Sequence, residues 1–149
     1  MELCVKNFSE LTTDELYSIM KLRVSVFVVE QQCPYMELDD LDKNALHVWL
    51  KDGDDIQAYL RIVDKTHDRE FVSIGRVIAV KRRCGLASRL LQEAIRLAKS
   101  SFNAEKIYLE AQVYAKSLYE KQGFVQISDE FMEDGIPHVK MLLDTAEII

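Results

Sequence analysis

The chain contains few of the residues that interrupt folded structure or crosslink it. Its 149 residues include 2 prolines, 5 glycines and 3 cysteines. This low proline and glycine content argues against a flexible linker or a low-complexity segment, and no internal repeat is visible. An odd number of cysteines without paired spacing argues against a disulfide framework and against a zinc site. We therefore expect no metal, and a reducing, cytoplasmic location.

Long apolar runs and an overall basic charge are missing as well. No run approaches the ~20 apolar residues that a membrane-spanning helix needs, and residues 1–6 lack the pattern of a signal peptide. The formal net charge of −6 disfavours nucleic acid and anionic membranes as partners. With 48% hydrophobic and 30% charged residues, we expect one globular domain over residues 1–149 with a continuous core.

The hydrophobic pattern alternates between the periods of strands and of helices. It predicts strands at 3–8, 45–51, 56–63, 71–80, 106–111, 124–131 and 138–143. It predicts helices from a cap near Thr12 to about Met20, at 22–30, from 86 to about 99, and over about 113–122. Turns are expected around Gly53 and Gly135. This order indicates a mixed α/β sheet with helices on its faces.

The junction at residues 82–87, Arg-Arg-Cys-Gly-Leu-Ala, connects a β-branched run to an amphipathic helix. The first N–H groups of such a helix have no partner within it. With the positive end of the helix dipole, they form an anion site suited to a pyrophosphate. Gly85 lets the backbone approach a ligand closely. Positive charge, either for an anionic cofactor or as a solvated surface cluster, is concentrated here in Lys81, Arg82, Arg83 and Arg89.

A second segment, residues 106–124, predicts a strand followed by a helix that ends at Gly123. Together the two segments resemble the GCN5-related N-acetyltransferase (GNAT) superfamily. The acetyl-CoA loop pattern of that superfamily, Gln/Arg-x-x-Gly-x-Gly/Ala, is matched by Arg82, Gly85 and Ala87. Its later pattern, Asn-x-x-Ala-x-x-x-Tyr-x-x-x-Gly-Phe, is matched by Ala115, Tyr119, Gly123 and Phe124, while Gln112 stands where Asn is usual.

The resemblance extends over most of the chain, because residues 22–35 and 133–138 are similar to the ElaA-like subgroup. It implies a mixed, mostly antiparallel sheet with a central strand splay and helices on both faces. It also implies an N-acetyltransferase that moves an acetyl group from acetyl-CoA to a primary amine of a small molecule or peptide, by direct attack on the thioester. A homodimer is compatible with it. The alternative is a non-catalytic acyl-CoA-binding or regulatory module with the same fold.

The resemblance also assigns roles to particular residues. Tyr119 is expected to be the catalytic acid that protonates the leaving thiolate, because a phenol with a pKa of ~10 is protonated at neutral pH. A purely packing role for this tyrosine is the alternative. The residues expected to contact the cofactor are Ile78, Ala79, Val80, Arg82, Arg83, Cys84, Gly85, Leu86, Ala87, Ser88 and Gln112.

The acceptor side is less well defined by the sequence. Glu30, Glu110 and His138 are candidates for binding the substrate. The same three residues and His47 are candidates for a general base, but relatives often use ordered water, and we assign no base. An acidic loop either attracts a cationic amine or is simply solvated; its carboxylates are Glu37, Asp39, Asp40 and Asp42.

Overall fold

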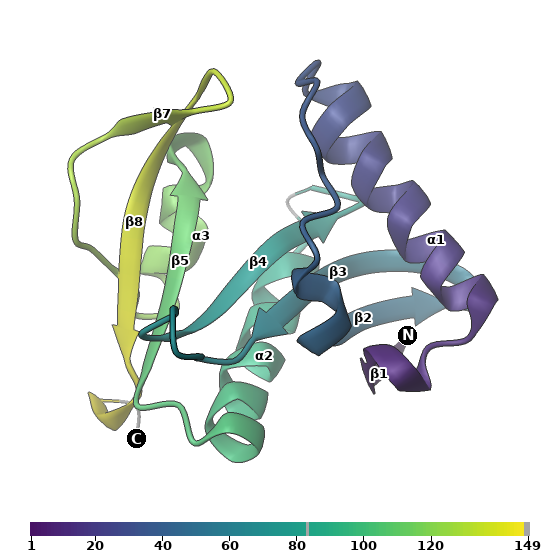
Figure 1. The fold of residues 1–149 in the computed structure, drawn as a ribbon, viewed down its shortest axis with the longest axis horizontal. Coiled ribbons are helices and arrows are strands. Elements are labelled where there is room, and N and C mark those ends of the chain that lie inside the picture. Colours follow the sequence, from purple (N-terminus) through teal and green to yellow (C-terminus); the bar gives the residue numbers. More distant parts are fainter. Residues whose placement is uncertain (83, 148–149) are drawn as a thin grey trace.

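The computed structural model describes residues 1–82 and 84–147 of the chain (Figure 1). The strands are β1 (Glu2–Asn7), β2 (Ala45–Asp52), β3 (Asp55–Val63), β4 (Val72–Ala79), β5 (Lys106–Gln112), β6 (Val125–Gln126), β7 (Phe131–Glu133) and β8 (Ile136–Asp144). The helices are α1 (Thr13–Val24), α2 (Leu86–Phe102) and α3 (Lys116–Glu120). A π-helical segment, η2 (Ser25–Glu30), follows α1 directly. Single-turn segments are η1 (Phe8–Glu10), η3 (Leu41–Asn44), η4 (Val113–Ala115) and η5 (Thr145–Glu147).

The strands form one sheet in the order β1-β2-β3-β4-β5-β8-β6, with β7 paired to β8. All paired neighbours run antiparallel except β4 and β5, which are parallel. Each face has its own core. Leu90 and Leu91 of α2 and Tyr119 of α3 belong to one, and Ile19 of α1 packs with Trp49 and Tyr59 in the other. The predicted mixed, mostly antiparallel sheet with helices on both faces is therefore confirmed.

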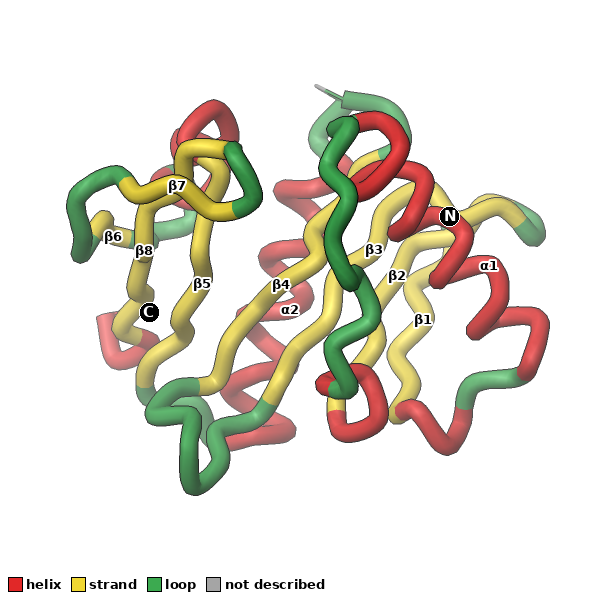
Figure 2. The backbone as a smooth tube through the Cα atoms, turned by 45° about the horizontal axis from the view of Figure 1, so that its top comes forward, coloured by secondary structure: helices red, strands yellow, loops and turns green. Residues whose placement is uncertain are grey.

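The two halves of the sheet separate between β4 and β5. These strands pair only at Val72–Ile107 and Ser73–Tyr108, and beyond that point they diverge (Figure 2). A bulge shifts the register of β4 on β3 between Tyr59 and Arg61. Opposite it Arg76 has a φ of 54°, which is unusual for a residue with a side chain. Bulges bend a strand, and this bulge lies in the part of β4 that diverges from β5, where the splay was expected.

Two predicted elements differ in the structure. The helices expected to break near Met20 form one continuous helical stretch from α1 through η2, because the backbone stays right-handed helical at Val24 and Ser25. The strand expected at 124–131 is reduced to β6 and β7. The predicted cap is confirmed, since Thr12 Oγ1 accepts the N–H of Glu15 at 3.1 Å. Both predicted turns are also present, with positive φ at Gly53 and Gly135.

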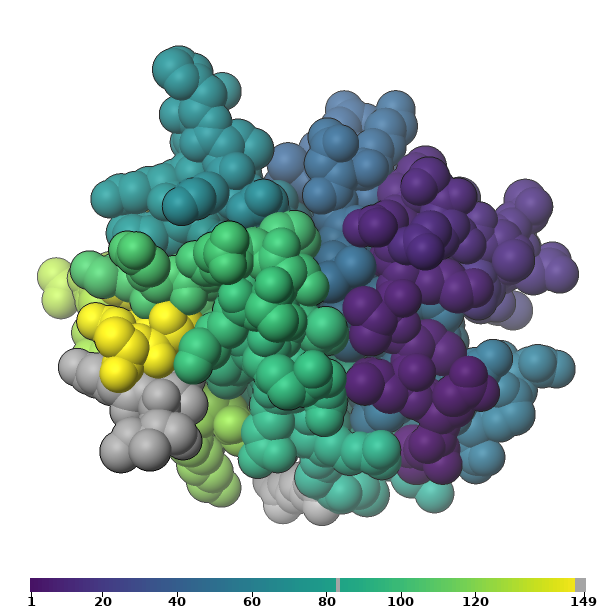
Figure 3. Space-filling model, turned by 90° about the horizontal axis from the view of Figure 1, so that it is seen from below, coloured from purple at the N-terminus to yellow at the C-terminus, as the bar shows by residue number. Residues whose placement is uncertain are grey.

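On the face of the molecule that is seen from below, helix α2 forms the central part of the surface. Figure 3 shows α2, in green, between N-terminal residues in purple and C-terminal residues in yellow. The buried side of α2 includes Leu90, Leu91, Ala94, Ile95 and Ala98, which match the predicted apolar face. Among the described residues, no helix combines the length and the apolar character needed to cross a membrane.

A buried network of charges joins α1 and the following loop to the sheet. Arg23 is fully buried and donates to Glu37 Oε1 at 2.8 Å and to Asp42 Oδ1 at 2.5 Å. Arg61 on β3 donates to the same Asp42 oxygen at 3.0 Å and to Asp39 at 2.5 Å. At these positions the acidic loop therefore neither presents free carboxylates to an amine nor is simply solvated, because arginines neutralise its carboxylates.

Removal of the central arginine should be strongly destabilising. Arg23→Met leaves two buried carboxylates with fewer partners, and loss of one partner from a buried ion pair costs about 3–5 kcal/mol. Arg96→Met is the matched control, because Arg96 is 61% exposed and pairs with Glu93 on the helix surface. We expect the control to change the free energy of unfolding in urea by less than about 0.5 kcal/mol. Equal losses in both variants would contradict a structural role for the network.

The same network predicts sensitivity to acid. Partial burial raises the pKa of Asp39, but the hydrogen bond and charge of Arg61 outweigh burial and lower it from 3.8 to about 2. The ionised carboxylate thus stabilises the fold above pH 3.8, and this contribution is lost as the pH falls toward 2. Asp39→Asn should be less stable than the unmodified chain at pH 7, and the difference should shrink at pH 3. Asp54→Asn, at an exposed turn, is the control.

Candidate active site

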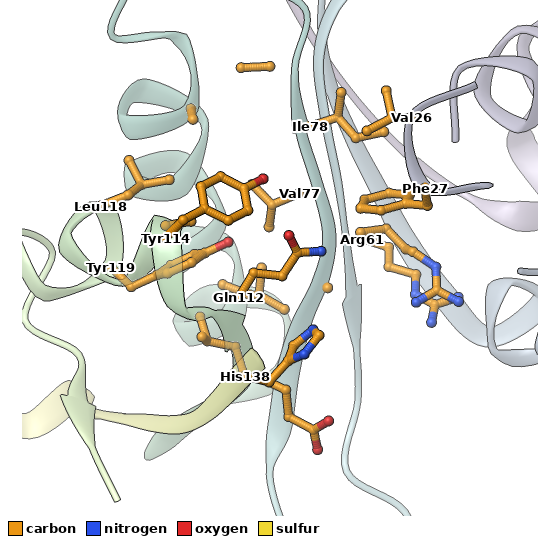
Figure 4. Close-up of a pocket in the computed structure, with 18 of the residues that line it drawn as sticks. Val26, Phe27, Arg61, Val77, Ile78, Gln112, Tyr114, Leu118, Tyr119 and His138 are labelled. Atoms are coloured by element: carbon orange, nitrogen blue, oxygen red, sulfur yellow. The ribbon is translucent and has the colours of Figure 1, made fainter. Parts of the chain in front are cut away.

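The splay opens into a cleft of about 1240 Å³ between β4 and β5. Figure 4 shows Tyr119, Gln112 and His138 reaching into it from one wall, with Phe27 and Val26 on the far side of β4. The structure brings nearly all of the predicted site residues to this cleft: Glu30, Ile78, Ala79, Val80, Arg82, Cys84, Gly85, Leu86, Ala87, Ser88, Glu110, Gln112, Tyr119 and His138. Arg83, predicted to bind the cofactor, lies outside the described residues.

The N-terminus of α2 lies at one end of the cleft. Gly85 is its N-cap residue with a φ of 76°, and it offers no side chain to cap the helix. The intrahelical bonds begin with Arg89 N–H, which donates to Gly85 O at 3.0 Å, so the preceding N–H groups have no intrahelical partner. Nothing lies within 4 Å of the position that a Cβ of Gly85 would occupy. This end of the cleft therefore has the geometry of an anion site.

Beyond Ser73, the edge of β4 that faces the splay has no strand partner among the described residues. Val80 N–H donates to Gln57 O at 2.9 Å, on the side of β3. Successive N–H groups of a strand point to opposite edges, so the N–H of Ala79 points toward the splay. Of the three residues predicted to contact a cofactor here, Ala79 is the one whose backbone can pair with an extended ligand as a further strand does.

Tyr119 is nearly buried, with its hydroxyl directed into the cleft (Figure 4). Gln122 N–H and Phe124 N–H both bond to Tyr119 O, at 3.0 and 3.2 Å, which fixes the end of the short helix. Its ring meets Phe124 edge-on, with 6.1 Å between the ring centroids. Burial raises the pKa of Tyr119, so the hydroxyl is protonated at neutral pH.

Gln112 connects the two walls instead of standing free in the cleft. Its amide exchanges two hydrogen bonds with that of Gln31, at 3.2 and 3.3 Å. A second link is close by, because Cys33 Sγ donates to Asp134 O at 3.3 Å. Gln31 and Cys33 follow the end of the π-helical segment, and their partners belong to the other half of the sheet. The segment after η2 thus spans the cleft.

The candidate acceptor residues have different surroundings. Glu30 is exposed and pairs with Arg82, so it belongs to the end of the cleft near the α2 N-terminus. His138 is buried, lines the cleft and lies directly across from Gln112 in the sheet. Glu110 lines the same wall and accepts the hydroxyl of Tyr108 at 2.7 Å. His47 is fully buried between Tyr59 and the backbone of Asp42, away from the cleft, so it is not an acceptor-site base.

Sequence reasoning missed the arginines that build the opposite wall. Arg76 donates to the Glu37 carboxylate and, at 2.8 Å, to the Glu37 carbonyl, and both Arg61 and Arg76 line the cleft. One available signal was an arginine within each of the apolar strand segments 58–63 and 72–79. Glu133 was also missed as a cleft residue, although it precedes a turn that the sequence did predict.

Comparisons with known proteins agree with this architecture. A family model described as an acetyltransferase (GNAT) domain matches residues 12–145. A UPF0039 protein of Schizosaccharomyces pombe is 38% identical over 148 residues, which is 97% of either chain. Protein ElaA of Escherichia coli is 36% identical over 137 residues, covering 89% of this chain and 90% of ElaA.

A solved structure gives the same result for the fold. An acyl-CoA N-acyltransferase from Pseudomonas aeruginosa has a TM-score of 0.90 and 35% identity, covering 96% of this chain and 99% of that one. The match spans both halves of the sheet and therefore the splay between them. On these grounds the chain belongs to the GNAT family of acetyltransferases, in its ElaA-like subgroup.

Proposed function

We propose that this protein is an N-acetyltransferase that moves the acetyl group of acetyl-CoA to a primary amine of a small molecule or peptide. The broader assignment, an acyl-CoA-dependent acyltransferase, follows from the family. The observation that carries the narrower one is the composition of the cleft. A helix end with uncapped N–H groups, a strand edge without a strand partner and a tyrosine hydroxyl lie along one continuous cavity in the described structure.

The cleft suits the three parts of acetyl-CoA in turn. The N–H groups at the start of α2 fit a pyrophosphate, and the free edge of β4 at Ala79 fits the amides of a pantetheine arm. Lys81 adds positive charge near the helix end, and Arg82 stands beside it paired with Glu30, in a chain whose net charge is −6. A thioester at the far end of the arm would then lie in the part of the cleft that Tyr119 faces.

The reaction needs two proton movements besides formation and cleavage of bonds. The neutral amine attacks the thioester carbonyl, a C–N bond forms, and the C–S bond breaks as the thiolate leaves. Tyr119 donates its hydroxyl proton to the sulfur, and the phenolate recovers a proton from the nitrogen that attacked. The products are the amide and the free thiol. Burial favours this use of the tyrosine, because it keeps the hydroxyl protonated between turnovers.

Release of free thiol from acetyl-CoA, measured across a panel of alkylamines, amino acids and peptides, tests the activity directly. We expect turnover with at least one class of amine. Acetyl-CoA binding by calorimetry without turnover of any amine would contradict this function and would support the non-catalytic acyl-CoA-binding module. Absence of both binding and turnover would contradict both.

Gly85→Asp should strongly weaken acetyl-CoA binding. The substitution adds a negative charge where the pyrophosphate is expected, which opposes binding at the helix end. Gly85→Ala controls for the positive φ, because open space surrounds the position. Gly53→Asp controls for the added aspartate, since Gly53 has a similar φ of 60° and equally open surroundings in a distant turn. We expect at least about tenfold weaker binding, or 1.4 kcal/mol, for Gly85→Asp alone. Unchanged affinity in that variant would refute the site.

Tyr119→Phe should slow the chemical step while leaving the fold intact. Within the described part of the chain the Tyr119 hydroxyl makes no hydrogen bond, so its removal leaves no broken pair behind. General acid catalysis contributes about 10²- to 10⁴-fold, and we expect a loss in that range in single-turnover kinetics. Tyr114→Phe is the control, because Tyr114 also lines the cleft but is 71% exposed. Equal rates for Tyr119→Phe and the unmodified chain would make Tyr119 a packing residue.

A further inference from the structure

His138 is held in one orientation and one tautomer. Its Nδ1 lies 2.7 Å from the carbonyl oxygen of Ile136. A carbonyl only accepts hydrogen bonds, so Nδ1 carries the proton, and in the neutral ring the lone pair is on Nε2. The ring also stacks on Phe131, with 5.9 Å between the centroids and 27° between the planes. These contacts fix where Nε2 points.

The lone pair of Nε2 is directed into the cleft and has no hydrogen-bond partner among the described residues. His138 is only 9% exposed, and its ring projects toward β4 in Figure 4. The nearest carboxylate oxygen, Glu133 Oε2, is 3.9 Å away, which is beyond hydrogen-bond distance. A nine-tenths buried base with a free lone pair usually has a partner, and the cleft is the side from which one can approach.

Two carboxylates lie on the same wall without a cation between them. Glu110 and Glu133 line the cleft, and the structure shows neither in an ion pair with a lysine or arginine in the part it describes. Partial burial and the charge of Glu110 raise the pKa of Glu133, as expected for two acids that repel each other. Lys140 is the cross-strand neighbour of Glu110, but its ammonium lies over the ring of Phe131. A cation in the cleft would relieve this repulsion.

We propose that Glu110 and Glu133 bind the protonated acceptor amine and that Nε2 of His138 removes its proton before acyl transfer. This inference rests on the proposed acetyltransferase function and names its acceptor site. Figure 4 shows Gln112 between Tyr119 and His138, and Glu133 Oε2 lies 3.9 Å from Nε2 of His138. The base and the acid therefore flank the same part of the cleft.

The protons balance with His138 in this role. The ammonium nitrogen passes one proton to Nε2 and becomes a neutral amine, which can attack the thioester carbonyl. The second proton leaves after attack and replaces the one that Tyr119 gave to the sulfur. The imidazolium then returns its proton to solvent, so one proton is released for each amide and thiol formed. Glu133, at 3.9 Å, stabilises the imidazolium while it exists.

The charge of this wall selects a class of acceptor. Two carboxylates attract an alkylammonium ion and repel an acceptor that also carries a carboxylate. We therefore expect alkylamines and diamines to be better acceptors than amino acids. Three probes of equal chain length separate these classes: 1,4-diaminobutane, butylamine and 4-aminobutanoate.

His138→Asn tests the base. Its side-chain amide can still donate to Ile136 O but has no equivalent of Nε2, so folding and acetyl-CoA affinity should be retained. We expect single-turnover acetylation of 1,4-diaminobutane at pH 7 to fall about 10²- to 10⁴-fold. The deficit should shrink toward pH 9, because the neutral fraction of an amine with a pKa of ~10 rises about tenfold per pH unit. The other titratable groups of this wall, Tyr108, Glu110, Tyr119, Glu133, Asp134 and Lys140, are unchanged in the variant.

Glu110→Gln/Glu133→Gln tests the selection of the acceptor. For the unmodified chain we expect kcat/KM to be at least about tenfold lower for 4-aminobutanoate than for butylamine. In the double variant the two values should converge, mainly through KM. Glu130→Gln is the control, because it removes an exposed charge just before β7 at a residue that does not line the cleft.

The outcomes separate this inference from the function on which it rests. A rate for His138→Asn equal to that of the unmodified chain, or a deficit that does not change with pH, would overturn the role of His138. Unchanged discrimination in the double variant would overturn the role of the carboxylates. Turnover of peptides but of none of the three probes would overturn the acceptor class alone. Absence of turnover with every amine would overturn the proposed function as well.

Discussion

The architecture of the site depends on the separation of two neighbouring parallel strands, β4 and β5. β4 keeps its antiparallel bonds to β3 but pairs with β5 at only two positions. The bulge at Arg76 lies three residues beyond the last of those pairs, at Ser73, and the side chain of this left-handed residue pairs with Glu37 and Asp39. Those carboxylates are in turn fixed by Arg23 and Arg61. A buried ion network on one side of the sheet thus supports the bend that opens the cleft.

The cleft combines three electrostatic environments within an acidic chain. On the network side, Arg23, Arg61 and Arg76 balance Glu37, Asp39 and Asp42, so that wall carries little net charge. The end at α2 is positive because of the helix N-terminus and the adjacent basic residues. The wall of β5 and β7 is negative, because Glu110 and Glu133 have no arginine or lysine partner where the structure describes them. This arrangement fits an anionic donor entering at one end and a cationic acceptor meeting it from another direction.

Local patterns were enough to predict the features that depend on neighbours in sequence. The turn glycines, the Thr12 cap and the helix after Gly85 follow from short-range rules, and Tyr119 lies in the cleft as the resemblance to the acetyltransferase pattern implied. The break expected after Met20 was wrong because the more apolar stretch that begins at Leu22 resembles the start of a new element, although no proline or glycine interrupts the chain there. The ion network was missed because its partners are far apart in sequence; Arg76 and Glu37 are separated by 39 positions.

Gln112 shows how a departure from the family pattern can be explained by geometry. The superfamily pattern has asparagine at this position, and the asparagine side chain is one methylene shorter. The longer glutamine reaches the amide of Gln31, and the two reciprocal bonds at 3.2 and 3.3 Å join the halves of the sheet across the cleft. Each amide is neutral and forms its hydrogen bonds with the other, so neither amide takes part in proton transfer. The groups left to exchange protons on this wall are Tyr119 on one side of the pair and His138, with its carboxylates, on the other.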